Sequence, residues 1–177
     1  GQVRGATLIN QKGDALNLDG ARIDGGAFLG SLTAIGSVRA LGAQITGQFD
    51  LHDAKLTNES GGALNLDRAR INGSASLGGL TATGAVSALG AQITGQFDLH
   101  DAKLTNENGD ALILDRARID GGARLGGLTA IGRVRALGAQ ITDQFDLRGA
   151  LLTNQGGDAL NLDRARINGS ASLGGLT

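Results

Sequence analysis

Two Asp-x-His pairs are the side chains of this chain best suited to proton transfer or metal binding, because a carboxylate beside an imidazole can serve either chemistry. They are Asp50 with His52 and Asp98 with His100, and a third copy of the motif carries Arg148 in place of the histidine. No nucleophile stands with a histidine and an acid at a usable spacing, and no phosphate-binding glycine signature occurs in usable context. We therefore predict no catalytic residue, no cofactor and no metal, and interpret the pairs as solvated surface groups.

A second charged group is a column of arginines that recurs at a fixed interval and alternates with glutamines. Such a column could bind phosphate or a carboxylated partner. Aspartates close by in the sequence could neutralise it, so we favour a structural ladder of ion pairs. The column consists of Arg22, Arg70, Arg118 and Arg166 with Gln44, Gln92 and Gln140, and the neutralising acids are Asp19, Asp24, Asp67, Asp115 and Asp163.

A third candidate is the segment from Thr105 to Ala111, which offers oxygen ligands on Asn106, Glu107, Asn108 and Asp110. It lacks the dense carboxylate spacing of a calcium loop. Its relatives elsewhere in the chain, TNESGGA and TNQGGDA, keep few acids. We predict a plain surface loop.

All these residues recur because the whole chain is a repeat. The stretch LNLDGARIDGG begins at Leu16 and returns nearly unchanged from Leu64, Leu112 and Leu160, with a constant period of 48 (64 − 16, 112 − 64 and 160 − 112). A fixed period of this length indicates a repeat architecture, in which each unit buries its apolar face only against its neighbours.

Each period divides into three 11-residue units and one 15-residue unit, with apolar side chains at places one, three, six and eight. Leu16, Leu18, Ala21 and Ile23 show the pattern, which is typical of very short strands with one buried face and not of a helix. We predict that two units form one coil with four short faces. Small coils of about 22 residues would then alternate with coils of about 26, and about seven coils would make a rod about 35 Å long.

This register predicts continuous interior columns. Leu16, Val38 and Leu64 begin one column, and in another alanine alternates with phenylalanine so that large side chains lie over small ones. Place ten is mostly Gly or Asn, which predicts a left-handed corner there, with Asp143 as a strained exception. The alternating column is Ala27, Phe49, Ala75, Phe97, Ala123 and Phe145. The corner residues are Gly25, Gly36, Gly47, Gly73, Gly84, Gly95, Gly121, Gly132, Gly169, Asn58, Asn106 and Asn154.

The segments LNLDG-ARIDG and FDLHD-AKLTN resemble consecutive pentapeptide repeats, and the resemblance covers the whole chain. Leu18, Ile23, Leu51 and Leu56 would be the central inward residues of that family's motif. The resemblance implies an all-β fold, a right-handed parallel quadrilateral β-helix. A sixth residue after every second pentapeptide, such as Gly26 or Ser37, departs from the family pattern and implies different corners.

Composition excludes several classes of function. The chain has 177 residues, no Cys, Trp, Tyr, Met or Pro, four Phe and a formal net charge of −1. Nucleic acids and acidic membranes require a clustered basic surface, so we predict that neither is a partner. A DNA mimic that acts on a topoisomerase, known among pentapeptide-repeat proteins, needs an acidic face, which this charge does not favour. No apolar run reaches the length of a membrane span.

One outward face is predicted to be flat and rich in threonine, and it is the candidate binding face. It is similar to the Thr-x-Thr arrays of ice-binding solenoids, although Lys55 and Lys103 interrupt it and threonine is common on any β surface. The threonines are Thr33, Thr57, Thr81, Thr83, Thr105, Thr129 and Thr153.

From these patterns we expect residues 1–177 to be a single uncapped solenoid, part of a longer protein or array. Val3, Ala6 and Leu8 at one end and Leu173 and Leu176 at the other would be exposed, which favours end-to-end stacking. The function expected is a non-enzymatic scaffold, a β-helical rod whose partner is itself or another protein. The alternative is a surface-binding module for ice or for a protein such as a topoisomerase-type target.

Overall fold

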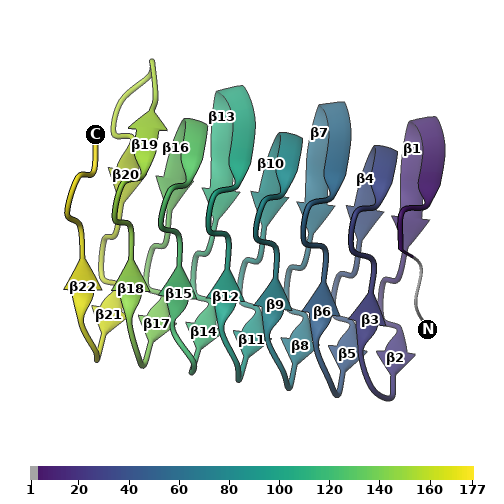
Figure 1. Cartoon of the computed structure of the whole chain (residues 1–177), viewed down its shortest axis with the longest axis horizontal. Coiled ribbons are helices and arrows are strands. Elements are labelled where there is room, and N and C mark those ends of the chain that lie inside the picture. Colours follow the sequence, from purple (N-terminus) through teal and green to yellow (C-terminus); the bar gives the residue numbers. More distant parts are fainter. Residues whose placement is uncertain (1–3) are drawn as a thin grey trace.

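The computed structural model describes residues 4–177, which form a β-solenoid built from parallel strands (Figure 1). Three sheets run side by side along the rod, and successive coils add one strand to each sheet. No helix occurs within residues 4–177, and thus none there is long and apolar enough to cross a membrane. The predicted all-β solenoid is confirmed.

The first sheet contains the longest strands of the rod. They are β1 (Thr7–Asn17), β4 (Thr33–Arg39), β7 (Lys55–Asn65), β10 (Thr81–Ser87), β13 (Lys103–Ile113), β16 (Thr129–Arg135), β19 (Leu151–Thr153) and β20 (Leu160–Asn161).

The other two sheets consist of two-residue strands. The second sheet contains β2 (Arg22–Ile23), β5 (Gln44–Ile45), β8 (Arg70–Ile71), β11 (Gln92–Ile93), β14 (Arg118–Ile119), β17 (Gln140–Ile141) and β21 (Arg166–Ile167). The third sheet contains β3 (Ala27–Phe28), β6 (Phe49–Asp50), β9 (Ala75–Ser76), β12 (Phe97–Asp98), β15 (Ala123–Arg124), β18 (Phe145–Asp146) and β22 (Ala171–Ser172).

Strand register confirms the alternation of two coil lengths. Leu16 pairs with Val38, a step of 22 along the chain (38 − 16), and Val38 pairs with Leu64, a step of 26 (64 − 38). The same alternation recurs at Val86, Leu112, Val134 and Leu160. We call the shorter turns small coils and the longer turns large coils.

The first sheet bends over a corner within its long strands β1 to β16, and in the last coil the two sides of the corner are the separate strands β19 and β20, so that each coil has four faces. In the small coils the corner residues are Gly36, Gly84 and Gly132, with φ of 110°, 107° and 112°. A Cβ at Gly84 would lie 2.5 Å from the carbonyl oxygen of Gly61 in the neighbouring coil. Glycine is therefore required both by the left-handed φ and by close approach of backbone.

The other predicted left-handed corners at place ten are mostly wrong. Gly25 does have a φ of 101°, but Asp143, the three predicted asparagines and five of the glycines do not have positive φ. At those glycines the requirement is space, since a Cβ at Gly73 would lie 2.8 Å from the carbonyl carbon of Gly47 in the preceding coil. The glycines without positive φ are Gly47, Gly73, Gly95, Gly121 and Gly169.

The recurrent left-handed corner lies instead at place five of every unit, where the sequence had not indicated one. Ala21 N–H donates to the Leu18 carbonyl at 3.0 Å, and Gly20 between them has a φ of 65°. A positive φ at the third residue of a four-residue turn is typical of a type II turn. The residues with this conformation are Gly20, Ser31, Gly42, Asp53, Arg68, Gly79, Gly90, Asp101, Arg116, Gly127, Gly138, Gly149, Arg164 and Gly175.

The interior is the predicted set of apolar columns. Ala27 pairs with Phe49, Phe49 with Ala75 and Ala75 with Phe97, and this alternation continues to Ala171. Phe49 and Phe97 are fully buried, with exposed fractions of 0%. Each of the three buried phenylalanines, Phe49, Phe97 and Phe145, therefore lies between two alanines, and the buried core contains no other aromatic residue among those described.

Candidate functional site

All seven predicted threonines lie on one outward face of the first sheet, in two adjacent columns. Thr33, Thr81 and Thr129 alternate with Lys55 and Lys103 in the first column. The second column follows without interruption by charge, as Ile35, Thr57, Thr83, Thr105, Ile131 and Thr153. The residues between the columns, such as Leu56 and Ala82, are buried.

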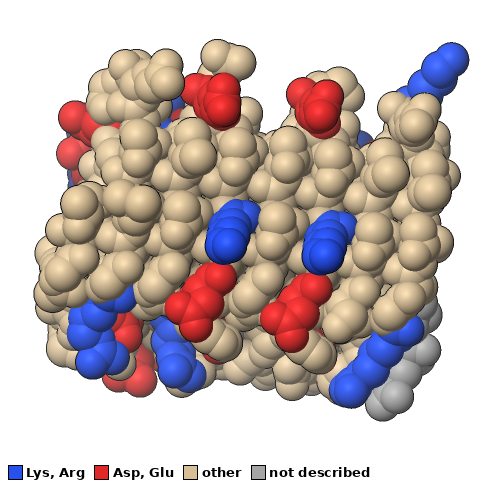
Figure 2. Space-filling model, turned by 45° about the horizontal axis from the view of Figure 1, so that its top comes forward, with Lys and Arg blue, Asp and Glu red and all other residues tan. Residues whose placement is uncertain are grey.

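Apolar side chains share this threonine face. Ile9, Ile131 and Leu151 are 64%, 38% and 45% exposed, and they are three of the four exposed large hydrophobic residues of the described chain. Figure 2 shows basic and acidic side chains as isolated, regularly repeated clusters on a surface that is otherwise uncharged. The face therefore offers rows of methyl and hydroxyl groups with two lysines among them.

The insertion of each large coil bulges out of the first sheet, within β1, β7 or β13 or between β19 and β20, so the surface loop predicted at Thr105 to Ala111 is part of a strand. We call these bulges loops. An asparagine closes each loop, a role that the sequence analysis missed. The side-chain amide donates to the carbonyl four residues further on, from Asn58 to Gly62 at 3.0 Å and from Asn106 to Asp110 at 2.9 Å. Asn10 and Asn154 do the same. The recurrence of asparagine at this place in every insertion was the signal available in the sequence.

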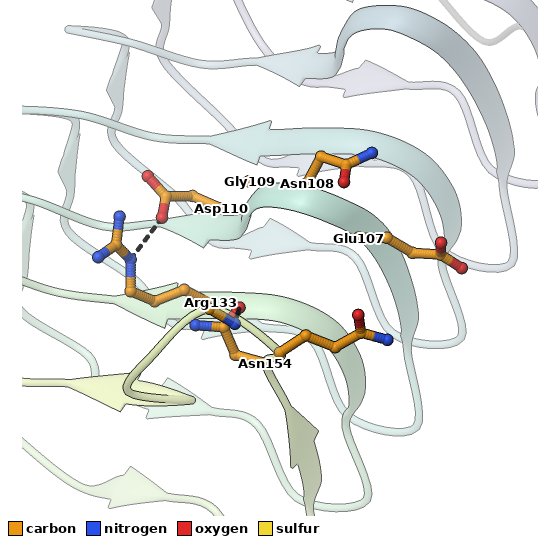
Figure 3. Close-up of a pocket in the computed structure, with 8 residues that line it drawn as sticks. Glu107, Asn108, Gly109, Asp110, Arg133 and Asn154 are labelled. Atoms are coloured by element: carbon orange, nitrogen blue, oxygen red, sulfur yellow. Dashed lines mark hydrogen bonds and ion pairs between the residues drawn. The ribbon is translucent and has the colours of Figure 1, made fainter.

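Neighbouring loops stand two coils apart, and grooves lie between them. Figure 3 shows the groove of about 350 Å³ between the third and fourth loops, with Arg133 from the small coil between them. Arg133 Nε donates to Asp110 Oδ1 at 2.6 Å. Glu107 and Asn108 belong to the wall formed by the third loop. Of the predicted oxygen ligands, Glu107, Asn108 and Asp110 thus line a polar groove, and Asn106 closes the third loop beside it.

Aspartates at place four stabilise the stacking of coils. Asp115 accepts the Leu137 N–H at 2.9 Å and is also hydrogen-bonded to the guanidinium of Arg135. Asp19 accepts from Leu41 N–H and Arg39 in the same way, and Asp67 accepts from Leu89 N–H and the Ser87 hydroxyl. The hydrogen bond to Asp115 raises the pKa of Arg135, and that to Asp19 raises the pKa of Arg39.

The predicted arginine column exists, but its predicted neutralisation by these aspartates is wrong. Arg22, Arg70, Arg118 and Arg166 alternate in register with Gln44, Gln92 and Gln140 along the second sheet. Asp19, Asp67 and Asp115 instead bond to the next coil, as described above. Within residues 4–177 the only ion pair of the column joins Arg118 Nε to Asp120 Oδ1 at 3.0 Å.

The two histidines are held against the rod. His52 Nδ1 lies 2.6 Å from Asp50 Oδ1, and the corresponding distance from His100 to Asp98 is 2.8 Å. A Cβ at Gly30 would lie 2.4 Å from the His52 ring, so the ring packs on glycine backbone of the preceding coil. Among the described residues, no group of three or more His, Cys, Asp or Glu could hold a metal ion.

The third copy of this motif replaces the histidine by an ion pair. Arg148 donates to both carboxylate oxygens of Asp146, from Nε at 2.9 Å and from Nη2 at 2.7 Å. These hydrogen bonds hold the pKa of the Asp146 carboxyl below its ordinary value and raise the pKa of Arg148. His52, His100 and Arg148 thus bond to equivalent aspartates, Asp50, Asp98 and Asp146, in three large coils.

Comparisons with protein-family models, curated proteins and solved structures found no match. The resemblance to pentapeptide repeats therefore rests on the residues of the chain itself.

Proposed function

We propose that this chain is a non-enzymatic scaffold, a rigid β-helical rod that fixes the distance and orientation of whatever it joins. One observation supports this most strongly. From Leu32 to Leu147 the inward residues of successive coils are almost all completely buried, and parallel ladders join each coil to both neighbours. Such a coil cannot open without exposing the core of the next one, which makes the rod stiff and cooperative.

Hydrogen exchange tests the rigidity that this proposal requires. Amides of the central coils that bond across the ladder, such as Phe97 N–H to Gly122 O, should exchange only when the rod unfolds as a whole. The expected protection factors are uniform from β6 to β15. Fast exchange in the central coils would contradict a rigid scaffold.

We also propose that rods stack end to end. The terminal layers lack the cover that interior layers have, since Leu173 is 46% exposed whereas its counterparts Leu77 and Leu125 are 0% exposed. Leu8 and Ala6 at the other end are partly buried, and Val3 lies outside the described residues. A second copy, or further coils of the same kind, would cover these apolar layers and pair the free strand edges.

Sedimentation over a wide concentration range tests stacking, with two matched variants. Leu173→Lys places a charge in the terminal layer and should abolish concentration-dependent growth. Leu151→Lys places the same charge on the threonine face and should leave growth unchanged. The opposite pattern would show side-by-side association, and a monomer at every concentration would contradict stacking.

The second candidate function is a surface-binding module that uses the threonine face to bind ice. The observation that favours it is the flat double column of hydroxyl and methyl groups that also contains three exposed large hydrophobic side chains. Thermal hysteresis tests it. If the face binds ice, Thr83→Lys should remove the activity, whereas Gln92→Lys on the second sheet should not. No hysteresis in the parent chain would leave only the scaffold proposal.

A further inference from the structure

Seven exposed arginines form a continuous strip along one side of the rod. Four are the arginines of the second sheet, and three lie two residues earlier in their coils, at the place-five corner that borders this sheet. The arginine strip is Arg22, Arg68, Arg70, Arg116, Arg118, Arg164 and Arg166, and all seven are exposed. Figure 1 shows that the strands of the second sheet follow one another in a row along the length of the molecule.

Few ion pairs neutralise the strip, in contrast to five arginines elsewhere on the rod. Arg39, Arg133, Arg135 and Arg148 all form ion pairs with aspartates at 3.0 Å or less, and Arg124 lies 4.0 Å from Asp98. Within the described residues, the strip has the single ion pair of Arg118. Five acids on this side form no ion pair with an arginine outside the strip within the described residues, fewer than its seven arginines. They are Asp24, Asp67, Asp120, Asp143 and Asp163.

Three members of the strip occupy backbone positions that suit glycine better. Arg68, Arg116 and Arg164 have φ of 57°, 55° and 56°. The first copy has Gly20 at this place, and the intervening coils have Gly42, Gly90 and Gly138. A left-handed conformation is unfavourable for a non-glycine residue. Arginine in three of four copies is therefore less favourable for the backbone than the glycine of the first copy, as are Ser31, Asp53 and Asp101 at equivalent corners.

The spacing of the arginine rows along the rod restricts which ligands can contact several rows at once. Arginine rows recur every second coil, which is about 10 Å at the usual separation of strands. Between them Gln44, Gln92 and Gln140 present amides that form no hydrogen bond with the part of the chain that the structure describes, and each amide can donate and accept. Shallow grooves of about 250 Å³ lie on this side, one bounded by Gln44 and Arg70 and another by Arg116 and Arg164. The strip therefore alternates rows of guanidinium groups with rows of amides, and Asp163 also lines the second groove.

We propose that the arginine strip binds a linear acidic polysaccharide that carries one carboxylate on every second sugar. Each sugar of an extended β-linked chain advances about as far as one coil of the solenoid, so the carboxylates meet the arginine rows and the intervening hydroxyls meet the glutamines. Arginine binds carboxylate through two parallel hydrogen bonds. Single-stranded nucleic acid fits less well, because it is bound largely by stacking of bases on aromatic side chains and the strip has none.

Binding of hyaluronan oligosaccharides, which carry one carboxylate per disaccharide, tests the proposal by calorimetry at low salt. Affinity should rise with each added disaccharide until the oligosaccharide spans the strip, and methyl esterification of the carboxylates should abolish it. The triple variant Arg70→Gln, Arg118→Gln, Arg166→Gln should raise the Kd about tenfold, because exposed ion pairs contribute little singly but act together. Glutamine already occupies this place in alternate coils, so the variant should fold normally.

Two further variants test whether a loss of affinity comes from the lower overall charge of the chain or from a change in fold stability. Lys55→Gln, Lys103→Gln, Arg124→Gln removes the same charge from other faces and should leave the Kd within about twofold. Arg68→Gly, Arg116→Gly, Arg164→Gly should weaken binding while it raises the melting temperature. No binding of hyaluronan, equal loss in the control variant, or tighter binding of a poly(dT) strand of equal charge would each overturn the proposal.

Discussion

Small and large coils share one interior and differ in what they expose. The small coil 64–85 and the large coil 86–111 place apolar residues at the same positions in register, yet the small coil has Ala75 where the large coil has Phe97. The small coil ends at a glycine corner with a φ of 107° at Gly84, whereas the large coil ends in the loop closed by Asn106. A large interior side chain in one coil thus faces a small one in the next coil. Each surface feature recurs in every second coil.

The largest effect is expected from a substitution that breaks the alternation of large and small side chains in the interior column. Phe97→Ala leaves three alanines stacked in one column and should lower the free energy of unfolding by about 3–5 kcal/mol. Phe28→Ala is the control, because this ring is only partly buried on the outside of a small coil. Its cost should be about 1 kcal/mol or less. Urea denaturation measures both, and equal costs would contradict the interior column.

The next effect distinguishes the two kinds of corner. Gly84→Ala forces a Cβ to within 2.5 Å of the Gly61 carbonyl oxygen at a positive φ, and should cost about 2–4 kcal/mol. Gly61→Ala in the neighbouring large-coil loop places its Cβ 3.5 Å from the nearest atom, Asn58 Nδ2, without a positive φ. It should change the melting temperature little. A similar loss in both variants would show that the small-coil corner is not specially strained.

The asparagine clamp should have a smaller effect, confined to the loop. Asn106→Ala removes the hydrogen bond to the Asp110 carbonyl and should cost about 1 kcal/mol, with faster proteolytic cleavage at residues 106–110. Asn108→Ala, in the same loop but without such a bond, should leave cleavage unchanged. If both variants are cleaved equally, the clamp does not order the loop.

The smallest expected effect concerns pH and the large coils alone. Arg148 lowers the pKa of Asp146, so the pair stabilises the fold above the ordinary carboxyl pKa, and this contribution is lost as pH falls through the lowered value. Arg148→Ala should raise the pKa of Asp146 in an NMR titration. The free energy of unfolding should then fall less steeply as the pH is lowered into the acid range. Because Arg148 is well exposed, the change in stability should be small. An unchanged pKa would rule out the ion pair in solution.

The period of the sequence was enough to predict the coil lengths, the register and the interior columns, because identical residues one period apart must occupy equivalent positions. The period did not distinguish corners that require a positive φ from corners that require space for a neighbouring backbone. Gly84 and Gly73 look alike in sequence, yet one needs a positive φ and the other needs room beside Gly47. From Leu16 onward, place five is glycine in eight of its fourteen copies, but other residues such as Arg68 and Asp53 interrupt this signal for a left-handed turn.

The surfaces were predictable in part. Alternation placed the seven threonines correctly on one face, since side-chain direction follows directly from register. The hydrogen-bond and ion-pair partners of charged side chains could not be predicted from the repeat pattern. Asp115, for example, bonds to Leu137 and Arg135 in the next coil and not to the nearby Arg118. Contacts between coils depend on side-chain direction at each corner, which the repeat pattern does not specify.

Each period of the sequence forms a two-coil segment of the rod, and segments stack in the same register. Small-angle X-ray scattering of the parent chain and of variants in which residues 64–111 are deleted or duplicated tests it most directly. We expect folded rods whose maximum dimension shortens or lengthens by about 10 Å while the cross-section stays constant. A change in cross-section, or loss of folding on duplication, would contradict it.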